Sequence, residues 1–424
     1  MTANQYFVPL LKNDNIVINV PGSKSITNRA FLIAALAPGK SILSNALESD
    51  DTHYMQQALQ ALGVEIKKER NTYIVSGLDG KFNSGDKEIY LGNAGTAVRF
   101  LTAAMILRNS KTKITGNQRM QERPLQDLLD GLKSLGAKID CPTGCPPVLI
   151  SGSQVENNIV SLAGNKSSQY FSAIMQIAPC LPKGVQLKVE GDLVSKPYID
   201  ITISVMEDFG VKVSNFDYQE FIIEKQSYHN IDYTIEADAS SASYWFALAA
   251  ISNKTVTVNN IALDSCQGDI NFLGVLEKMG CKIQAVGNKI TVTGPKKLKA
   301  LGEIDMNAMP DVAMTLAIVA ACAPGETKMI NIANLRIKET DRITALASEL
   351  QKMNISCQEL KEGLVINGSN QRKGAEIETY DDHRMAMCFA VLGAVTPNIV
   401  ILDPACVSKS YPSFFDDFDA VMKG

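Results

Sequence analysis

The stretch PGSKSITNRAFLIAALA, residues 21–37, decides how this chain folds. Ser23 is a favoured helix N-cap residue, and apolar residues recur after it at helical spacing, so we expect a helix to begin within two residues of Ser23. Lys24 lies in the first turn, where the helix dipole is positive, and Arg29 follows Ser25 by one turn. Cations there are unfavourable unless an anion is bound. The stretch therefore favours an anion site, with a surface helix whose cations point into water as the alternative.

Similar polar helix starts recur about every 70 residues, which predicts an internal repeat of six units. The six starts are residues 22–25, 92–96, 164–168, 237–241, 309–311 and 380–384. Each unit adds a second amphipathic helix and a strand pair. Left-handed C-caps are expected just past five of these second helices, at Gly63, Gly136, Gly210, Gly280 and Asn354.

A β-α-β-α-β-β unit of this length cannot bury its own helix face. We therefore expect an α/β protein with two similar domains, each formed by three units packed around buried helices. One domain would comprise residues 1–19 and 237–424, because the N-terminal strand is expected to pair with the far domain. Residues 20–236 would form the other domain.

The composition is that of an ordinary globular protein, with 424 residues, of which 46% are hydrophobic and 20% charged. A net charge of -4 argues against a broad nucleic-acid or membrane surface, so an anion must be bound where Lys and Arg converge locally. The apolar run 313–323 is too short to span a bilayer. The nine cysteines form no disulfide or zinc pattern. We expect a cytoplasmic protein that uses neither metal nor cofactor.

Ten segments resemble, in order, those of the 5-enolpyruvylshikimate-3-phosphate synthase family. They read PGSKSITNRA, LGNAGTAVR, GNQRMQERP, SSQY, LVSKPYIDIT, ADASSASY, NAMPDVAMT, NLRIKETDR, DDHRMAMCFA and VSKSYP. Together they cover nearly the whole chain. The departure is Phe100, where Pro or Leu is familiar. The resemblance implies an inverse α/β barrel fold with two domains, an active site in the cleft between them, and a monomer.

The resemblance also implies roles for residues at matching positions. The shikimate 3-phosphate contacts would be Lys24, Ser25, Arg29, Ser167, Ser168, Gln169, Ser195, Asp311, Asn334 and Lys338. The phosphoenolpyruvate contacts would be Lys24, Gly95, Arg123, Gln169, Arg342, Arg384 and Lys409. The catalytic residues would be Asp311, which takes a proton from the attacking hydroxyl, Glu339, which protonates the methylene carbon, and Lys24. From the residues alone, Asp311 after Pro310 is better explained as a helix N-cap.

The implied reaction transfers the enolpyruvyl group of phosphoenolpyruvate to the 5-hydroxyl of shikimate 3-phosphate and releases phosphate. Addition to a C=C bond needs a base at oxygen and an acid at carbon, which two carboxyl groups can supply. One alternative is the related UDP-N-acetylglucosamine enolpyruvyl transferase, but its reactive Cys is missing from residues 116–124. The other is a non-catalytic phosphoester or RNA-binding module, which lacks a basic stripe interleaved with aromatic residues. The family is the target of glyphosate, and we expect Gly95 to border that inhibitor.

Overall fold

The computed structural model describes residues 4–423, which divide into two compact units. Unit 2 spans Gly22–Glu236, and unit 1 combines the described residues up to Pro21 with those from Ala237 onward. The first crossing thus lies two residues later than the sequence analysis places it. The reason is Asn260 of unit 1, whose side chain accepts from the N–H of Val20 at 3.0 Å and donates to its carbonyl at 2.7 Å.

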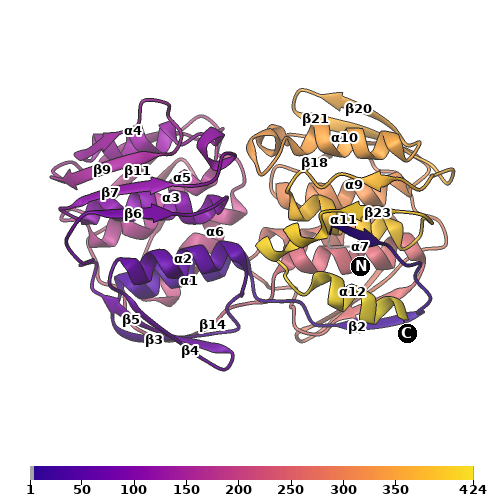
Figure 1. Ribbon diagram of the computed structural model, residues 1–424, viewed down its shortest axis with the longest axis horizontal. Coiled ribbons are helices and arrows are strands. Elements are labelled where there is room, and N and C mark those ends of the chain that lie inside the picture. The colour runs from indigo at the N-terminus through magenta and orange to yellow at the C-terminus, as the bar shows by residue number, and fades with distance from the viewer. Residues whose placement is uncertain (1–3, 424) are drawn as a thin grey trace. The chain divides into compact units, whose positions relative to one another are not determined.

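Unit 2 contains three repeats (Figure 1). Its helices are α1 (Lys24–Leu36), α2 (Asp50–Ala61), α3 (Gly95–Ala104), α4 (Gln126–Ser134), α5 (Ser168–Ile177) and α6 (Pro197–Asp208). Its strands are β3 (Pro38–Ser44), β4 (Glu65–Glu69), β5 (Thr72–Leu78), β6 (Lys87–Tyr90), β7 (Lys111–Thr115), β8 (Ala137–Asp140), β9 (Val148–Ser153), β10 (Ile159–Ala163), β11 (Val185–Glu190), β12 (Ser214–Phe216), β13 (Glu220–Ile223) and β14 (Asp232–Thr234). Short 3-10 turns are η1 (Met105–Leu107), η2 (Met120–Glu122) and η3 (Ala178–Cys180).

Unit 1 repeats the pattern three more times. Its helices are α7 (Ala239–Ser252), α8 (Phe272–Lys278), α9 (Ala313–Ala321), α10 (Arg342–Lys352), α11 (His383–Gly393) and α12 (Phe414–Lys423). Its strands are β1 (Gln5–Phe7), β2 (Asn15–Ile18), β15 (Thr255–Val258), β16 (Lys282–Val286), β17 (Lys289–Thr293), β18 (Gly302–Asp305), β19 (Gly325–Ile330), β20 (Ser356–Leu360), β21 (Gly363–Gly368), β22 (Glu376–Ile377) and β23 (Val400–Leu402). Its 3-10 turns are η4 (Gly268–Asn271), η5 (Pro310–Val312), η6 (Ala333–Ile337) and η7 (Pro404–Lys409).

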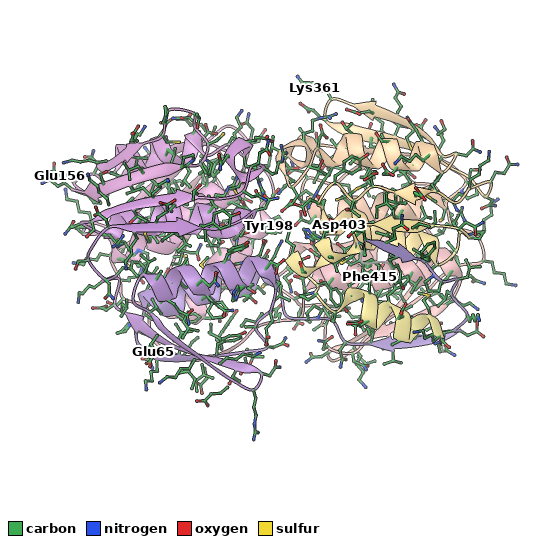
Figure 2. The ribbon with its side chains drawn as sticks, in the orientation of Figure 1. Glu65, Glu156, Tyr198, Lys361, Asp403 and Phe415 are labelled. Carbon is green, nitrogen blue, oxygen red and sulfur yellow. The ribbon has the colours of Figure 1, made fainter. Side chains whose placement is uncertain are left out.

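Each repeat forms its own small sheet, in which the first two strands are parallel and the others antiparallel. The orders are β14-β3-β5-β4, β6-β7-β9-β8, β10-β11-β13-β12, β2-β15-β17-β16, β18-β19-β21-β20 and, for the shorter last repeat, β22-β23-β1. The N-terminal strands therefore complete two sheets of unit 1. Phe415 of α12, labelled in Figure 2, packs on Tyr6 of β1 with ring centroids 4.3 Å apart.

The first helix of every repeat is buried and contacts the other two of its unit. In unit 2 these helices are α1, α3 and α5, and in unit 1 they are α7, α9 and α11. Every residue of α3, α9 and α11 is buried. The prediction of buried central helices is therefore confirmed, and the reason is that each small sheet covers only the outer face of its helix. None of the helices within residues 4–423 has both the length and the apolar character needed to cross a membrane.

The predicted helix ends are also confirmed. Ser23 caps α1 with its hydroxyl, which accepts from the N–H of Ile26. The four glycines expected to end second helices have φ of 98° at Gly63, 107° at Gly136, 85° at Gly210 and 106° at Gly280. All are left-handed, where a side chain is strained and glycine is not.

Candidate functional site

The candidate residues of unit 1 gather around the guanidinium of Arg342, the first residue of α10. Its Nε donates to Asp382 at 2.7 Å, Nη2 to Glu339 at 2.9 Å and Nη1 to Asp311 at 3.2 Å. Arg342 is only 1% exposed. Burial lowers the pKa of Arg342, but the three carboxylates outweigh burial and raise that pKa overall. Arg342 is therefore a permanent cation that holds three segments of unit 1 together.

Arg384, the second residue of α11, links the starts of the three buried helices in unit 1. Its Nη2 donates to Oδ2 of Asp311 at 2.8 Å and lies 3.4 Å from the hydroxyl of Ser240 in α7. Its Nη1 donates to the hydroxyl of Tyr244 at 3.1 Å. Asp311 thus receives one arginine on each carboxylate oxygen, and this pairing favours the site interpretation of Asp311 over the helix cap.

Lys409 completes the cluster from the end of η7, with Nζ 3.8 Å from Oε1 of Glu339. The cluster now contains three cations, Arg342, Arg384 and Lys409, and three carboxylates, Asp311, Glu339 and Asp382. We call these six residues the unit 1 cluster. Its charges balance, so an incoming anion would draw a cation away from a carboxylate.

Asn334 and Lys338, the remaining candidates of unit 1, lie in and just after η6, both half-buried. Lys338 and Arg342 do not form one solvated helix face, because α10 begins only at Arg342 and Arg342 is buried. Asp341 caps this helix, with Oδ1 accepting from the N–H groups of Ile343 and Thr344 at 3.2 and 3.1 Å.

In unit 2, the phosphoenolpyruvate candidates lie where α3 begins. Nη1 of Arg123 donates to the carbonyl and side-chain oxygens of Asn93 at 3.3 and 3.0 Å. A Cβ placed on Gly95 would lie 2.6 Å from Nη2 of Arg123. Nε2 of Gln169, near the start of α5, donates to the Thr96 hydroxyl at 3.3 Å. The structure therefore brings Gly95, Arg123 and Gln169 together at two neighbouring helix starts, where the positive end of the helix dipole suits an anion.

Arg29 is almost completely buried within unit 2, with only 1% of its surface exposed. Its Nε donates to the Thr202 hydroxyl at 2.8 Å, while Nη2 donates to the Ser172 hydroxyl at 3.2 Å and the Tyr198 carbonyl at 3.1 Å. The guanidinium also stacks over the ring of Phe100, 5.1 Å from the centroid. The unusual Phe100 therefore packs under Arg29.

The other candidates of unit 2 occupy helix starts or the loops before them. Lys24 begins α1, and its Nζ lies 3.4 Å from the carboxylate of Asp51. Ser25 follows it, and its carbonyl accepts from Nη1 of Arg29 at 2.8 Å. Ser167 caps α5, with its hydroxyl accepting from the N–H of Gln169. Ser168 begins that helix, and Ser195 lies in the loop before α6 with φ of 55°.

Sequence reasoning missed several residues that shape the site. The sequence shows Asp382 only as part of a helix start, yet the residue is fully buried against Arg342 and also caps α11. Asp51, Asn93 and Tyr244 were not singled out. The available signal was the position of Asp382 at the N-cap of a helix whose next residues are His383 and Arg384. Within residues 4–423, no group of three His, Cys, Asp or Glu side chains is arranged to hold a metal ion.

Comparison with known proteins identifies the family. The model of EPSP synthase (3-phosphoshikimate 1-carboxyvinyltransferase) matches residues 13–418. The chain is 43% identical over 99% of both chains to a 3-phosphoshikimate 1-carboxyvinyltransferase of Shewanella halifaxensis, and 45% identical over 94% of both to that of Klebsiella pneumoniae. A solved EPSP synthase from Acinetobacter baumannii superposes with a TM-score of 0.82 at 25% identity, covering 99% of this chain and 98% of that one. The chain belongs to the EPSP synthase family.

Proposed function

We propose that this protein transfers the enolpyruvyl group of phosphoenolpyruvate to the 5-hydroxyl of shikimate 3-phosphate and releases phosphate. The family membership supports this reaction and its place in the shikimate pathway. The observation that carries the proposal is the unit 1 cluster, in which Asp311 and Glu339 share the guanidinium of Arg342. Addition followed by elimination needs a base and an acid, which two neighbouring carboxyl groups can supply.

In this proposal, Asp311 accepts the proton of the attacking hydroxyl, and Glu339 protonates the methylene carbon. The hydroxyl oxygen then bonds to C2 of phosphoenolpyruvate. The π electrons of the carbon–carbon double bond form a new C–H bond at C3, which leaves a single bond between C2 and C3. In the second step the Glu339 carboxylate takes a proton from the methyl group, and the C–O bond to phosphate breaks while the leaving phosphate takes the proton held by Asp311. This restores the double bond and the starting protonation of both carboxyl groups. The substrate anions would draw Arg342, Arg384 and Lys409 away from the carboxylates. The proton affinity of Asp311 and Glu339 would then rise as the substrate binds.

The assignment of site residues is part of the same proposal. Lys24, Gly95, Arg123 and Gln169 of unit 2 would bind phosphoenolpyruvate together with the cations of unit 1. Arg29, Ser167 and their neighbours would bind shikimate 3-phosphate. These assignments are supported by the charge of the side chains, by the position of the residues at helix starts and by the matching family segments. A cytoplasmic location, favoured by nine free cysteines, and a monomeric state complete the proposal.

The test is an assay of phosphate release from phosphoenolpyruvate with each candidate acceptor. Release with shikimate 3-phosphate, and none with UDP-N-acetylglucosamine, is expected. Release with the nucleotide sugar alone would overturn the substrate assignment. Light scattering after size exclusion tests the monomer, since a mass of twice the 46.0 kDa chain would show a dimer.

A further inference from the structure

Asp269 is a buried carboxylic acid to which the proposed reaction assigns no role. It lies in η4, which contacts α7 and directly precedes α8 in the sequence, and it is 6% exposed. Its Oδ2 accepts a hydrogen bond from the hydroxyl of Ser240. A buried carboxyl group that pairs with a neutral hydroxyl rather than a cation is costly to ionise.

The hydroxyl of Ser240 connects Asp269 to the unit 1 cluster. While the O–H donates to Asp269, Oγ lies 3.4 Å from Nη2 of Arg384 and can accept from it. The same Nη2 donates to Asp311 at 2.8 Å. Asp269, Ser240, Arg384 and Asp311 therefore form one line of hydrogen bonds that ends on the proposed catalytic base.

The charge of Asp269 depends on its surroundings. Burial first, and then the negative charge of Asp311, raise the pKa of Asp269, which is about 7. Asp238 also raises this pKa, while the Ser240 hydrogen bond and the charge of Arg384 lower it. The neighbouring α8 carries its charges, Glu277 and Lys278, at its exposed far end.

We infer that Asp269 is a positioning residue for Arg384, which acts through the Ser240 hydroxyl and sets how firmly Arg384 holds an anion. An ionised Asp269 fixes the Ser240 O–H and turns a lone pair of Oγ toward Arg384, so the guanidinium is retained by the protein. A protonated Asp269 removes that negative charge, and Arg384 is more available to a ligand. Anion binding at Arg384 and proton binding at Asp269 therefore favour each other.

This inference rests on the proposed function only for the identity of the anion, so its first test needs no ligand. With ¹⁵N-labelled arginine, the side-chain signals of Arg384 are followed by NMR from pH 5.5 to 8.5 and assigned with Arg384→Lys. We expect a shift with a midpoint near pH 7 in the wild type, consistent with the raised pKa of Asp269. Asp269→Asn should abolish it. Asp264→Asn is the matched control, because Asp264 is exposed in the loop before η4.

Ser240→Ala keeps Asp269 but breaks its connection to Arg384, so this variant should also remove the pH-dependent shift of the Arg384 signal. It provides the test if Asp269→Asn fails to fold. An Arg384 signal that is constant with pH in the wild type, or that titrates equally in Asp269→Asn, would overturn the inference.

The second test measures the Kd for phosphoenolpyruvate by calorimetry at pH 6 and pH 8. The substrate titrates in this range too, so the informative quantity is the ratio of the wild-type Kd to that of Asp269→Asn. We expect that ratio to rise on the order of tenfold between the two pH values. A constant ratio would count against the inference. If phosphoenolpyruvate does not bind but the Arg384 signal still titrates only with Asp269 present, the proposed function fails and the inference stands.

Discussion

Asp311 and Glu339, two of the three carboxylates that share Arg342, differ in their other partners. Asp311 also accepts from Arg384, whereas Glu339 lies near Lys409. Cations that move separately when a substrate binds would set the proton affinities of Asp311 and Glu339 apart from each other. This difference gives each carboxyl group a distinct task in the proposed reaction.

Asp311→Asn and Glu339→Gln should each lower kcat by on the order of 100-fold or more while both substrates still bind. Both changes keep the shape of the side chain and remove its ability to exchange a proton. Turnover and calorimetric binding provide the measurement, and Asp305→Asn, exposed on β18, is the control. Lys338→Met should instead weaken shikimate 3-phosphate first. Near-normal turnover of Asp311→Asn would remove it as the base.

Gly95→Ala should weaken both glyphosate and phosphoenolpyruvate, with the larger effect on the longer inhibitor. The new Cβ would lie 2.6 Å from Nη2 and 2.9 Å from Cζ of Arg123, so the guanidinium must move. Overpacking of this kind costs about 1–3 kcal/mol, which corresponds to roughly 5- to 150-fold in affinity. The measurement is the inhibition constant of glyphosate against phosphoenolpyruvate for the wild type and for Gly95→Ala. Gly274→Ala is the control, because no atom lies within 4 Å of the Cβ that this change would add. Equal constants would show that the Gly95 backbone does not border the inhibitor.

Asp269 should also make the stability of the fold depend on pH. Its pKa in the folded protein is about 7, above the value of about 3.9 for an unfolded chain. The folded state therefore binds this proton more strongly, and the stabilisation is lost as pH rises from about 4 to 7. Asp269→Asn does not ionise, so its stability relative to the wild type should increase between pH 5 and pH 8. Urea unfolding at both pH values measures this, and an unchanged difference would contradict it.

Among the secondary-structure elements, the starts of the first helices hold many of the proposed site residues. Side chains at their N-caps or first turns satisfy backbone N–H groups, as Ser167 does in α5 and Asp382 does in α11. The same turns present Arg384 and Gln169 beside them. A helix start therefore supplies both a rigid support and a positive end of the helix dipole at the position where an anion is expected.

The ends of the second helices provide a matched test of the repeat. Gly136 and Gly280 occupy the same repeat position with φ of 107° and 106°. Gly280→Ala should destabilise by about 1–2 kcal/mol, the cost of a side chain in the left-handed region. Gly136→Ala should cost more, because its Cβ would lie 2.1 Å from the carbonyl oxygen of Gln154. Urea denaturation compares them, and equal losses would show that the chain relaxes around Gln154.

At the scale of the whole molecule, the chain begins in one unit, builds the other and then returns. Strand β2 pairs in parallel with β15, more than 200 residues later in the sequence, and β1 pairs with β23 near the C-terminus. Unit 1 therefore depends on a segment that is distant from the rest of its sequence.

Ile16→Ala should destabilise unit 1 by about 2–5 kcal/mol, because Ile16 of β2 is 3% exposed and lies in its core. Val17→Ala, on the opposite face of the same strand and 62% exposed, should cost less than about 0.5 kcal/mol. Hydrogen exchange should show the loss of protection in β15 and β17, with unit 2 unaffected. Similar behaviour of the two variants would show that β2 does not stabilise this sheet.

The sequence by itself determined the starts of the buried helices and the left-handed helix ends, because each of these depends on residues within one turn of each other. The recurrence of these local patterns along the chain was enough to predict the six repeats. The sequence also supported the family through motifs. Only the tertiary structure decided that Asp311 accepts from two arginines, that Asp382 is buried against Arg342, and that Phe100 packs under Arg29. These contacts join residues of different repeats or helices. Their geometry depends on how whole helices pack, which no local pattern encodes.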